Sequence, residues 1–436
     1  MKTNGGEEGS EEEEEVAFDL AAAVATFRAL AEQMDVFRRK DLKPLRRALH
    51  PLVVAARSAS GLKEHCVNLS GEISNALNLR QWETVFHKVL EMKRARMVPK
   101  LGALQRWVRQ CGDVLPKQLA IFLLSRIIDL TSATGIDEAH AKRLTASYAL
   151  FASDEKGEPE TASRQLVVMP PFLPAHRQGH GSVLSSPYPI KRDNFIVDSC
   201  VLGKDRRPPS SIDMNIYRAK KDAIVACDTC HGVCSDEVPG VPGALLLSNV
   251  LSPAECAQLI QSAEMLGYYD DAVEGIEALV WISDDTLLRP IFQRCKNLLP
   301  QTSHNGKQVA GINPRLRFFR YGEGAVYRPH IDGSWTANGD AALLNSSADE
   351  IHSYYTFLIY LNGGFEGGGT TFFVPPSGTS GDYSAEGSII ARSVQPVQGS
   401  VLCFPHGVVE GSLVHEGSAV TGNGKKYVIR TDLMFS

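Results

Sequence analysis

His330 and Asp332 stand two residues apart in the segment YRPHID, which pairs an imidazole with a carboxylate. On a β-strand, residues i and i+2 project to the same face, so these two side chains would share one space. Two histidines and one carboxylate bind one face of a non-haem iron and leave its other positions open. His415 is the predicted third ligand, and His352 and His406 are its rivals.

Further motifs accompany this pair, in a fixed order along the C-terminal half. They are Tyr321-Gly322, Thr356–Asn362, Gly367–Phe372, Gly399–Pro405, His415–Gly417 and the basic segment Lys425–Asp432. Over Pro239–Ser436 the set resembles the 2-oxoglutarate/iron(II)-dependent oxygenases, in particular their prolyl-4-hydroxylase-like branch. The resemblance does not extend to residues 1–238.

This resemblance implies a C-terminal double-stranded β-helix, or jelly roll, with flanking helices. It implies that His330, Asp332 and His415 are both the metal ligands and the catalytic residues. Fe(II), the cosubstrate 2-oxoglutarate and O2 are the implied cofactors, with ascorbate as a further candidate. The reaction would convert 2-oxoglutarate to succinate and hydroxylate an unactivated C–H bond.

The resemblance also implies a basic residue that holds the far carboxylate of 2-oxoglutarate. Relatives usually place it nine or ten residues after the distal histidine, whereas Lys425 and Lys426 follow His415 by ten and eleven. Strand parity puts Lys426 and Arg430 on one face and Lys425 on the other. Lys426 is therefore the predicted carboxylate partner and Arg430 the alternative, since a guanidinium can bind a carboxylate bidentately.

Three hydroxyl-bearing residues belong to the same prediction. Tyr321 and Thr356 match positions that hydrogen-bond the cosubstrate in relatives. Tyr360 shares the strand face of Thr356, and the sequence leaves open whether it lines the site or belongs to the core.

Two other motifs could carry chemistry. Cys227-Asp228-Thr229-Cys230-His231, with Cys234 nearby, has the pattern of haem attachment or of a zinc site, although reduced loop cysteines are the simpler interpretation. A basic stretch from Lys88 to Arg109 contains Trp107 and is compatible with nucleic-acid binding, although most such stretches are solvated helix faces.

The elements that must position these residues divide the chain into four parts. Residues 1–15 form an acidic tail of the kind that is usually disordered. Residues 16–150 have apolar side chains at steps of three and four, which predicts an all-α domain. Residues 151–239 are rich in Pro and Gly and form a connecting region, either a linker or extended chain packed on the next domain. Residues 240–436 are the predicted oxygenase domain, and the whole chain belongs to the α+β class.

Within the last part, one helix has clear boundaries. Ser252-Pro253-Ala254-Glu255 has the pattern of a capping box with proline at the first helical position, and Gly267 would end the helix. Beyond Gly311, short apolar segments separated by glycine turns predict a sandwich or barrel of strands.

Composition limits the environment. The net charge of −5 comes largely from the acidic tail and gives no indication of a nucleic-acid or membrane partner. The odd count of nine cysteines favours a reducing compartment. No apolar run is long enough to cross a bilayer, and the acidic N-terminus resembles no targeting peptide. The cytoplasm or nucleus is therefore the expected location.

The sequence predicts a dioxygenase that hydroxylates a macromolecule, with a peptidyl proline or another protein side chain as the first candidate. A nucleic-acid base demethylase and a non-catalytic jelly-roll binding module are the alternatives. The helical domain would select or position the macromolecular partner. On that hypothesis, residues 240–436 alone would retain uncoupled 2-oxoglutarate turnover. The sequence gives no oligomeric state.

Overall fold

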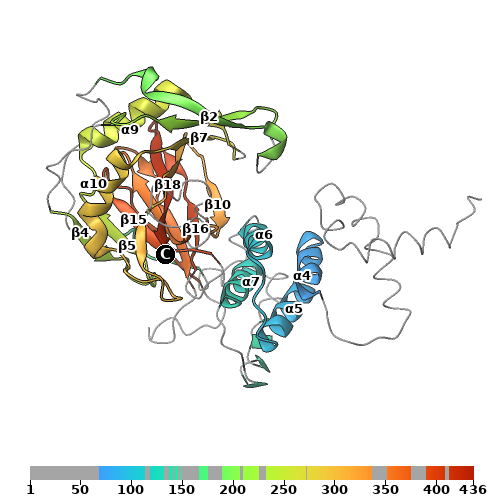
Figure 1. The fold of residues 1–436 in the computed structure, drawn as a ribbon. Helices are drawn as coiled ribbons and strands as arrows, with labels where there is room; N and C mark the ends of the chain where they lie inside the picture. Colours follow the sequence, from blue (N-terminus) through green and yellow to red (C-terminus); the bar gives the residue numbers. More distant parts are fainter. Residues whose placement is uncertain are drawn as a thin grey trace, which may run out of the picture. The chain divides into compact units, whose positions relative to one another are not determined.

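The computed structural model describes residues 68–112, 118–131, 166–174, 189–206, 210–224, 232–271, 273–335, 351–374, 389–407 and 412–436, with isolated residues between 136 and 148. Asn68–Ser436 form one compact unit, in which helices and strands are mixed (Figure 1). The predicted acidic tail and the first predicted helix lie outside the described residues. The all-α domain over 16–150 therefore stays a prediction as a whole.

Four helices with described bounds lie in that predicted domain: α4 (Leu69–Asn78), α5 (Trp82–Arg94), α6 (Leu101–Gly112) and α7 (Gln118–Asp129). The side chain of Asn68 caps α4 by accepting a hydrogen bond from the amide of Gly71 at 3.0 Å. The apolar faces of these helices meet in one core that includes Phe86, Trp107 and Phe122. Their amphipathic periodicity thus produces helix-on-helix packing.

Most of the strands form two sheets. The minor sheet has the order β1 (Leu166–Val168), β14 (Ile389–Val394), β13 (Thr370–Val374), β16 (Val414–Gly417), β10 (Tyr327–His330). The major sheet has the order β2 (Phe195–Val201), β3 (Met214–Ala219), β7 (Ile276–Ile282), β9 (Arg315–Tyr321), β18 (Lys426–Phe435), β11 (His352–Tyr360), β15 (Val401–Pro405), β5 (Leu245–Ser248), β4 (Cys234–Glu237).

The shorter elements complete this arrangement. In the major sheet, β6 (Tyr269–Asp270) pairs with β7, and β8 (Val309–Ile312) pairs with β18. A separate ribbon joins β12 (Glu366–Gly367) to β17 (Val420–Thr421). Three 3-10 turns are described: η3 (Arg192–Asn194), η4 (Gly203–Asp205) and η5 (Lys296–Leu298).

The two sheets face each other across an apolar core. Phe372 of β13 and Phe404 of β15 meet edge to face, with ring centroids 5.1 Å apart. The same core contains Tyr360 of β11, Val394 of β14 and Val428 of β18. This α+β architecture is consistent with the predicted jelly roll.

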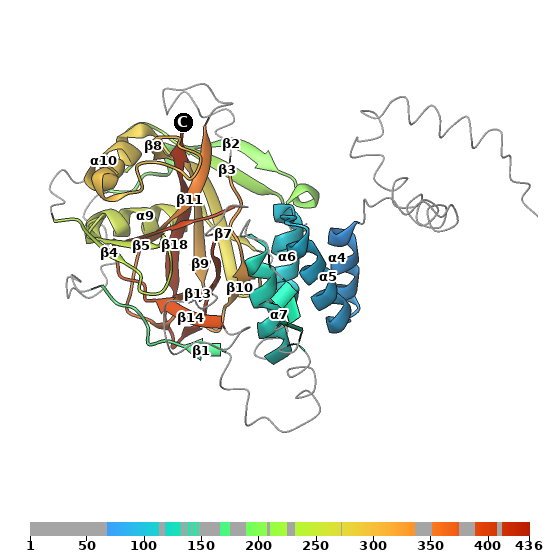
Figure 2. The ribbon, with the colours of Figure 1, turned by 90° about the horizontal axis from the view of Figure 1, so that it is seen from below.

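Two helices cover the other face of the major sheet: α9 (Pro253–Leu266) and α10 (Asp285–Cys295) (Figures 1 and 2). The capping box predicted for α9 is confirmed, because Ser252 Oγ accepts from the Glu255 amide at 3.2 Å and Glu255 Oε2 accepts from the Ser252 amide at 2.7 Å. Gly267 ends the helix with a φ of 89°, which a residue with a Cβ rarely adopts. Leu259 of α9 packs into the core that contains Phe318 and Ile429.

The Pro- and Gly-rich region of residues 151–239 contributes strands to both sheets. β1 pairs in parallel with β14, and the β2–β3 hairpin joins the major sheet through β3 and β7. β4 adds the strand at the other end of the major sheet. The described segments of this region are therefore extended chain built into the sheets. Among the described residues, no helix has the length and apolar composition needed to span a membrane.

Candidate metal centre

The two histidines of the predicted triad face each other across a pair of antiparallel strands. β10 ends at His330, and His415 of β16 is its direct partner in the ladder. The ring centroids lie 4.3 Å apart. An irregularity between Tyr327 and His330 bends β10, and such bulges often direct a side chain into a site.

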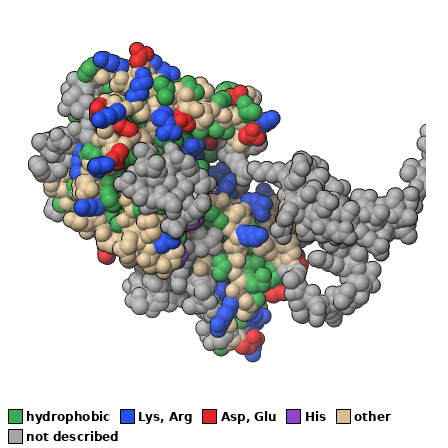
Figure 3. All heavy atoms as spheres, viewed as in Figure 1, with side chains coloured by type: hydrophobic (Ala, Val, Ile, Leu, Met, Phe, Trp, Pro, Cys, Tyr) green, Lys and Arg blue, Asp and Glu red, His purple; other side chains and the backbone are tan. Residues whose placement is uncertain are grey.

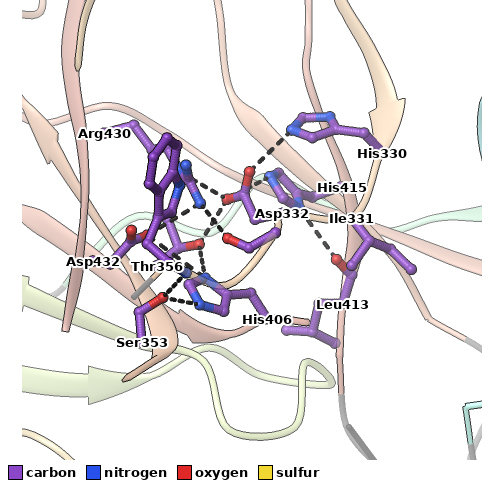
Figure 4. Close-up of polar contacts among 12 residues, drawn as sticks. His330, Ile331, Asp332, Ser353, Thr356, His406, Leu413, His415, Arg430 and Asp432 are labelled. Atoms are coloured by element: carbon purple, nitrogen blue, oxygen red, sulfur yellow. Dashed lines mark hydrogen bonds and ion pairs between the residues drawn. The ribbon is translucent and has the colours of Figure 1, made fainter. Parts of the chain in front are cut away.

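Asp332 completes a three-residue cluster, although it lies beyond the end of β10. Its Oδ1 lies 3.5 Å from His330 Nε2, and its Oδ2 lies 3.7 Å from His415 Nε2 (Figure 4). One ligand atom from each residue lies within 4.8 Å of the other two. Donors bound at right angles, about 2.1 Å from one metal, would lie about 3 Å apart. The cluster therefore fits a single transition-metal ion once the donor atoms move closer together around it.

Each imidazole is oriented through its second nitrogen. His330 Nδ1 lies 2.9 Å from the carbonyl oxygen of Arg328, and His415 Nδ1 lies 3.2 Å from that of Leu413. Because a carbonyl only accepts, each Nδ1 carries the proton and each Nε2 offers its lone pair to a metal. Burial is the main cause that lowers the pKa of His415 to about 3, so its ring is neutral, as metal binding requires.

Two groups hold the carboxylate of Asp332. Thr356 Oγ1 donates to Oδ2 at 2.6 Å, and Arg430 Nε lies 3.4 Å from the same oxygen. Burial favours the neutral acid, but the positive charge of Arg430 is the main effect that opposes it, and the pKa of Asp332 lies well below its usual value. Asp332 is therefore an ionised carboxylate in a fixed orientation, as a metal ligand at this position would need to be.

His406, a rival third ligand in the sequence, contacts hydroxyl groups instead of joining the cluster. Its Nδ1 lies 2.9 Å from Thr356 Oγ1, and its Nε2 lies 3.0 Å from Ser353 Oγ (Figure 4). Since Thr356 gives its one proton to Asp332, His406 donates to Thr356, and Ser353 donates to His406. Burial lowers the pKa of His406 to about 4, so a neutral ring fits this chain of bonds. His406 thus orients the Thr356 hydroxyl, which in turn binds the carboxylate of Asp332.

The triad opens into a cavity between the two sheets. Its walls come from β9, β11, β15 and β18 of the major sheet and from β10, β13 and β16 of the minor sheet. Lys426 lines this cavity although its side chain is only 2% exposed. Its Nζ lies 4.7 Å from the centre of the Tyr321 ring, and burial lowers its pKa to about 7. The cavity thus combines a candidate metal-binding triad with a buried amine able to meet an anion.

The family model of the 2OG-Fe(II) oxygenase superfamily matches residues 316–431. These residues belong to that superfamily. The match contains the three clustered residues and Lys426, and it confirms the family predicted from the sequence. The protein is accordingly an oxidoreductase, and the cofactors of its oxygenase domain are Fe(II), 2-oxoglutarate and O2.

Solved structures similar to the oxygenase domain differ greatly from it in sequence. A 2OG-Fe(II) oxygenase family oxidoreductase from Burkholderia pseudomallei is 16% identical, with a TM-score of 0.27, and covers 44% of this chain and 84% of its own. A prolyl-4-hydroxylase from Pseudomonas putida is 17% identical, with a TM-score of 0.27, and covers 44% and 91%. HygX from Streptomyces hygroscopicus, with nickel, 2-oxoglutarate and hygromycin B bound, is 14% identical, with a TM-score of 0.28, and covers 45% and 83%.

These similarities are too low to transfer a substrate to this chain. No curated protein sequence matches it.

In the oxygenase domain, the predicted parity of β18 is observed. Lys426, Val428 and Arg430 line the cavity, whereas Ile429 and Leu433 lie in the core under α9 and α10. Lys425, just before the strand, is exposed. Arg430 is already engaged, because its Nη2 lies 3.1 Å from Asp432 Oδ1 while its Nε faces the triad carboxylate.

The three hydroxyl-bearing residues have different surroundings. Tyr321 lines the cavity beside Lys426, and burial raises its pKa well above the usual value. Thr356 also lines the cavity, but its proton is committed to Asp332. Tyr360 is fully buried and donates to Thr370 Oγ1 at 2.8 Å. His352, the other rival ligand, begins β11 opposite Phe435 and is not part of the cluster.

Other residues that the sequence did not single out also lie at this site. Arg317, Tyr327 and Glu416 line the cavity, and Gln105 of α6 donates to the carbonyl oxygen of Ile331 at 2.7 Å. Alternation along β9 could have placed Arg317 on the face of Tyr321. Nothing local in the sequence connects Gln105 with a residue more than two hundred positions away.

Among the described residues, the remaining sequence motifs form no second cluster of metal ligands. Cys227, Cys230 and His231 lie outside the described residues. In the basic stretch, Lys93 Nζ lies 3.4 Å from Asp129 Oδ2, and Trp107 is fully buried, with its indole NH donating to a serine hydroxyl. Exposed Lys and Arg side chains remain on the surface of these helices (Figure 3).

Proposed function

We propose that this protein is an active dioxygenase that hydroxylates a C–H bond of a protein side chain, with a peptidyl proline as the first candidate. His330, Asp332 and His415 would hold the Fe(II), and the oxygenase domain would form a double-stranded β-helix. One observation carries the proposal: two imidazole Nε2 atoms and an ionised carboxylate converge in a cavity that also presents a buried amine. A binding module without catalysis would have no use for this combination.

Lys426 is the proposed partner of the far carboxylate of 2-oxoglutarate. Arg430 is the weaker candidate, because Asp332 and Asp432 already neutralise its guanidinium. Among the described residues, no ion pair involves Lys426, and burial is the sole cause of its lowered pKa. A carboxylate beside this amine would offset the desolvation of its charged form. Tyr321, next to Lys426, is proposed to complete the carboxylate site.

The remaining residues act as supports. With Fe(II) and 2-oxoglutarate bound, O2 would be the oxidant: one of its oxygen atoms enters succinate as CO2 is released, and the other enters the substrate C–H bond to give the hydroxylated product. The carbonyls of Arg328 and Leu413 fix the imidazole rings, while Thr356 and Arg430 hold Asp332 ionised and in one orientation.

Metal binding and cosubstrate turnover test the assignment of the triad. Asp332→Ala should lose both tight binding of one Fe(II) under anaerobic conditions and the conversion of 2-oxoglutarate to succinate. His406→Ala is the matched control, because it removes the rival imidazole: it should still bind one Fe(II), with lower affinity. Succinate production at the wild-type rate by Asp332→Ala would disprove the triad.

A proteome-wide search tests the substrate class. Lysate proteins incubated with the enzyme, Fe(II) and 2-oxoglutarate should gain the mass of one oxygen atom at a defined side chain, detected by mass spectrometry. The Asp332→Ala protein provides the background of spontaneous oxidation. We also propose a cytoplasmic or nuclear location, which imaging of the tagged full-length chain would test.

A further inference from the structure

Arg317 is a partly buried cation in the cavity of the oxygenase domain. It lies on β9, on the same face as Phe319 and Tyr321, and all three line the cavity with the triad. In the major sheet Arg317 is the direct cross-strand partner of Arg430. It therefore lies beside the guanidinium that contacts Asp332, at the metal end of β18, whereas Lys426 pairs with Tyr321 at the other end.

Arg317 has no anion in ion-pair contact within the described part of the chain. Its guanidinium lies over the Phe319 ring, 5.1 Å from the ring centre, and its charge acts on Asp432 only from a distance. Arg320 on the opposite face of the same strand differs, because it binds Glu277 at 2.5 Å. Taking a guanidinium out of water without a close partner is costly, so an arginine that lines a cavity in this state favours an anionic ligand.

The established cofactors leave Arg317 without a contacting partner. One carboxylate of 2-oxoglutarate is assigned to Lys426, and the other accompanies Asp332 in neutralising a divalent metal. Asp432 is in contact with Arg430. After these pairs are formed, Arg317 is the cavity-lining cation among the described residues that still lacks a counter-charge within reach. The group that supplies it must come from the molecule that is hydroxylated.

We propose that Arg317 is a specificity-determining residue that binds the carboxylate of an Asp or Glu side chain close to the hydroxylated residue of an acidic peptide. This inference rests on the proposed function and names its substrate class. A nucleic acid fits less well, because its repeated phosphates need a continuous basic surface. Glu416 lines the same cavity, and Asp271 acts electrostatically on Tyr327 in its wall. A single carboxylate needs only one cation, whereas a run of phosphates would also face these acids.

The test uses the full-length protein with Fe(II), 2-oxoglutarate and a randomised synthetic peptide library. Peptides that gain one oxygen are sequenced by tandem mass spectrometry, and succinate is measured in every sample. Wild type is compared with Arg317→Met, Arg317→Glu and Lys425→Met. Lys425→Met is the matched control, because it removes an exposed cation that does not line the cavity.

Wild type and Lys425→Met should enrich Asp or Glu at a fixed distance from the hydroxylated residue. Arg317→Met should lose this enrichment, and Arg317→Glu should favour Lys or Arg instead. For the best peptide, changing its acidic residue to the amide should raise KM at least about tenfold in wild type and less than about twofold in Arg317→Met. Such coupling reports a direct pair rather than a general loss of structure.

Three results would overturn the inference while the reaction class stands. They are peptide products without acidic preference, the same preference in Arg317→Met, and oxygen gained by a randomised oligonucleotide instead of any peptide. A raised KM for 2-oxoglutarate in Arg317→Met, with peptide preference intact, would assign this arginine to the cosubstrate and also overturn it. Absence of 2-oxoglutarate turnover in wild type would instead contradict the proposed function itself.

Discussion

Lys426 and Arg430 lie on one face of β18, yet their charges have different surroundings. The Arg430 guanidinium lies 3.1 Å from Asp432 Oδ1 and also contacts the carboxylate of Asp332. Lys426 faces the Tyr321 ring and has no carboxylate beside it in the described part of the protein. At the scale of single residues, Arg430 is therefore a structural cation that is already paired, whereas Lys426 is the cation available to bind a ligand.

Removing the amine tests this distinction. Lys426→Ala should raise KM for 2-oxoglutarate by about 100-fold or more, since losing one partner of a buried charge pair costs about 3–5 kcal/mol. Lys425→Ala is the control and should change KM little, because Lys425 is exposed. Steady-state succinate assays at varied 2-oxoglutarate provide the comparison. If Lys425→Ala instead raised KM for 2-oxoglutarate strongly, the assigned strand register would be wrong. If only Arg430→Ala raised this KM, the far carboxylate of 2-oxoglutarate would be bound by the Arg430 guanidinium.

The pKa of Lys426 adds a pH dependence. In the cosubstrate-free protein this pKa is lowered to about 7, and a bound carboxylate would raise it. Below pH 7 the amine is already protonated, so affinity is insensitive to pH. Above pH 7 binding must take up a proton, so Kd for 2-oxoglutarate should rise about tenfold per pH unit until the raised pKa is reached.

Calorimetry at pH 8 on metal-loaded, anaerobic protein measures this uptake directly, through buffers with different protonation enthalpies. Nearly one proton should be taken up per 2-oxoglutarate bound. Lys426→Arg is the control: a guanidinium stays charged, so uptake should vanish and the pH profile should flatten. Equal uptake by both proteins would assign the proton to another group.

At the scale of elements, α6 runs along the segment that carries two of the proposed metal ligands. A Cβ on Gly112 would lie 3.0 Å from Pro329, and a Cβ on Gly333 would lie 3.6 Å from Leu101. Between these contacts, Gln105 donates to the carbonyl oxygen of Ile331 at 2.7 Å. Figures 1 and 2 both show α6 beside β10. The helix thus holds the short span between His330 and Asp332 from outside the cavity.

Gln105→Met keeps the size of the side chain and removes the donor. Since groups that support metal ligands typically change metal affinity by 10–100-fold, we expect Co(II) binding to weaken by about tenfold, measured by anaerobic spectroscopic titration. Gln110→Met is the control on the same helix, because its hydrogen bond runs to Asn78, 2.5 Å away, and not to the ligand segment. Equal Co(II) affinity in Gln105→Met and Gln110→Met would show that Gln105 contributes only to packing and not to metal binding.

At the scale of the whole molecule, the helices and the oxygenase domain share their cores. Ile331, Phe373 and Val414 of the ligand segment and the minor sheet lie in the same apolar cluster as Trp107 and Phe122 of the helices. On the major sheet, β3 and β2 extend the surface beyond β7. A fragment that begins at residue 240 would expose both the outer face of one sheet and a new edge of the other.

This sharing changes the outcome expected for residues 240–436. The sequence hypothesis predicts that this fragment retains uncoupled turnover, whereas the shared core leads us to expect a fragment that aggregates or binds hydrophobic dyes. Residues 68–436 should fold cooperatively and retain turnover. Thermal unfolding and succinate assays on both fragments would show whether residues 240–436 fold and turn over 2-oxoglutarate without the helices. A soluble, active 240–436 fragment would show that the helices serve partner selection rather than the fold.

Local patterns determined much of this site. The alternation along β18 involves neighbouring residues, whose relative directions follow from strand geometry alone. Asp332, by contrast, lies beyond the end of β10, and His415 lies on another strand. The capping box of α9 is equally local. These features are sufficient to separate Lys425 from Lys426, whereas the prediction of His415 over His352 and His406 rests on the family resemblance. Periodicity also predicted the helices, but not the surface they cover.

Only the tertiary structure shows which of the side chains able to bind a ligand are already bonded to other residues of the protein. Arg430, Thr356 and His406 all carry groups suited to a ligand, yet each is committed to a partner far away in the sequence, as the bond from Thr356 to Asp332 shows. The same holds for Gln105, which donates to Ile331, whereas the Arg317 guanidinium lies over a ring and contacts no acid among the described residues. Hydrogen bonds and ion pairs act over a few ångströms, and only the folded chain brings such distant residues within that range.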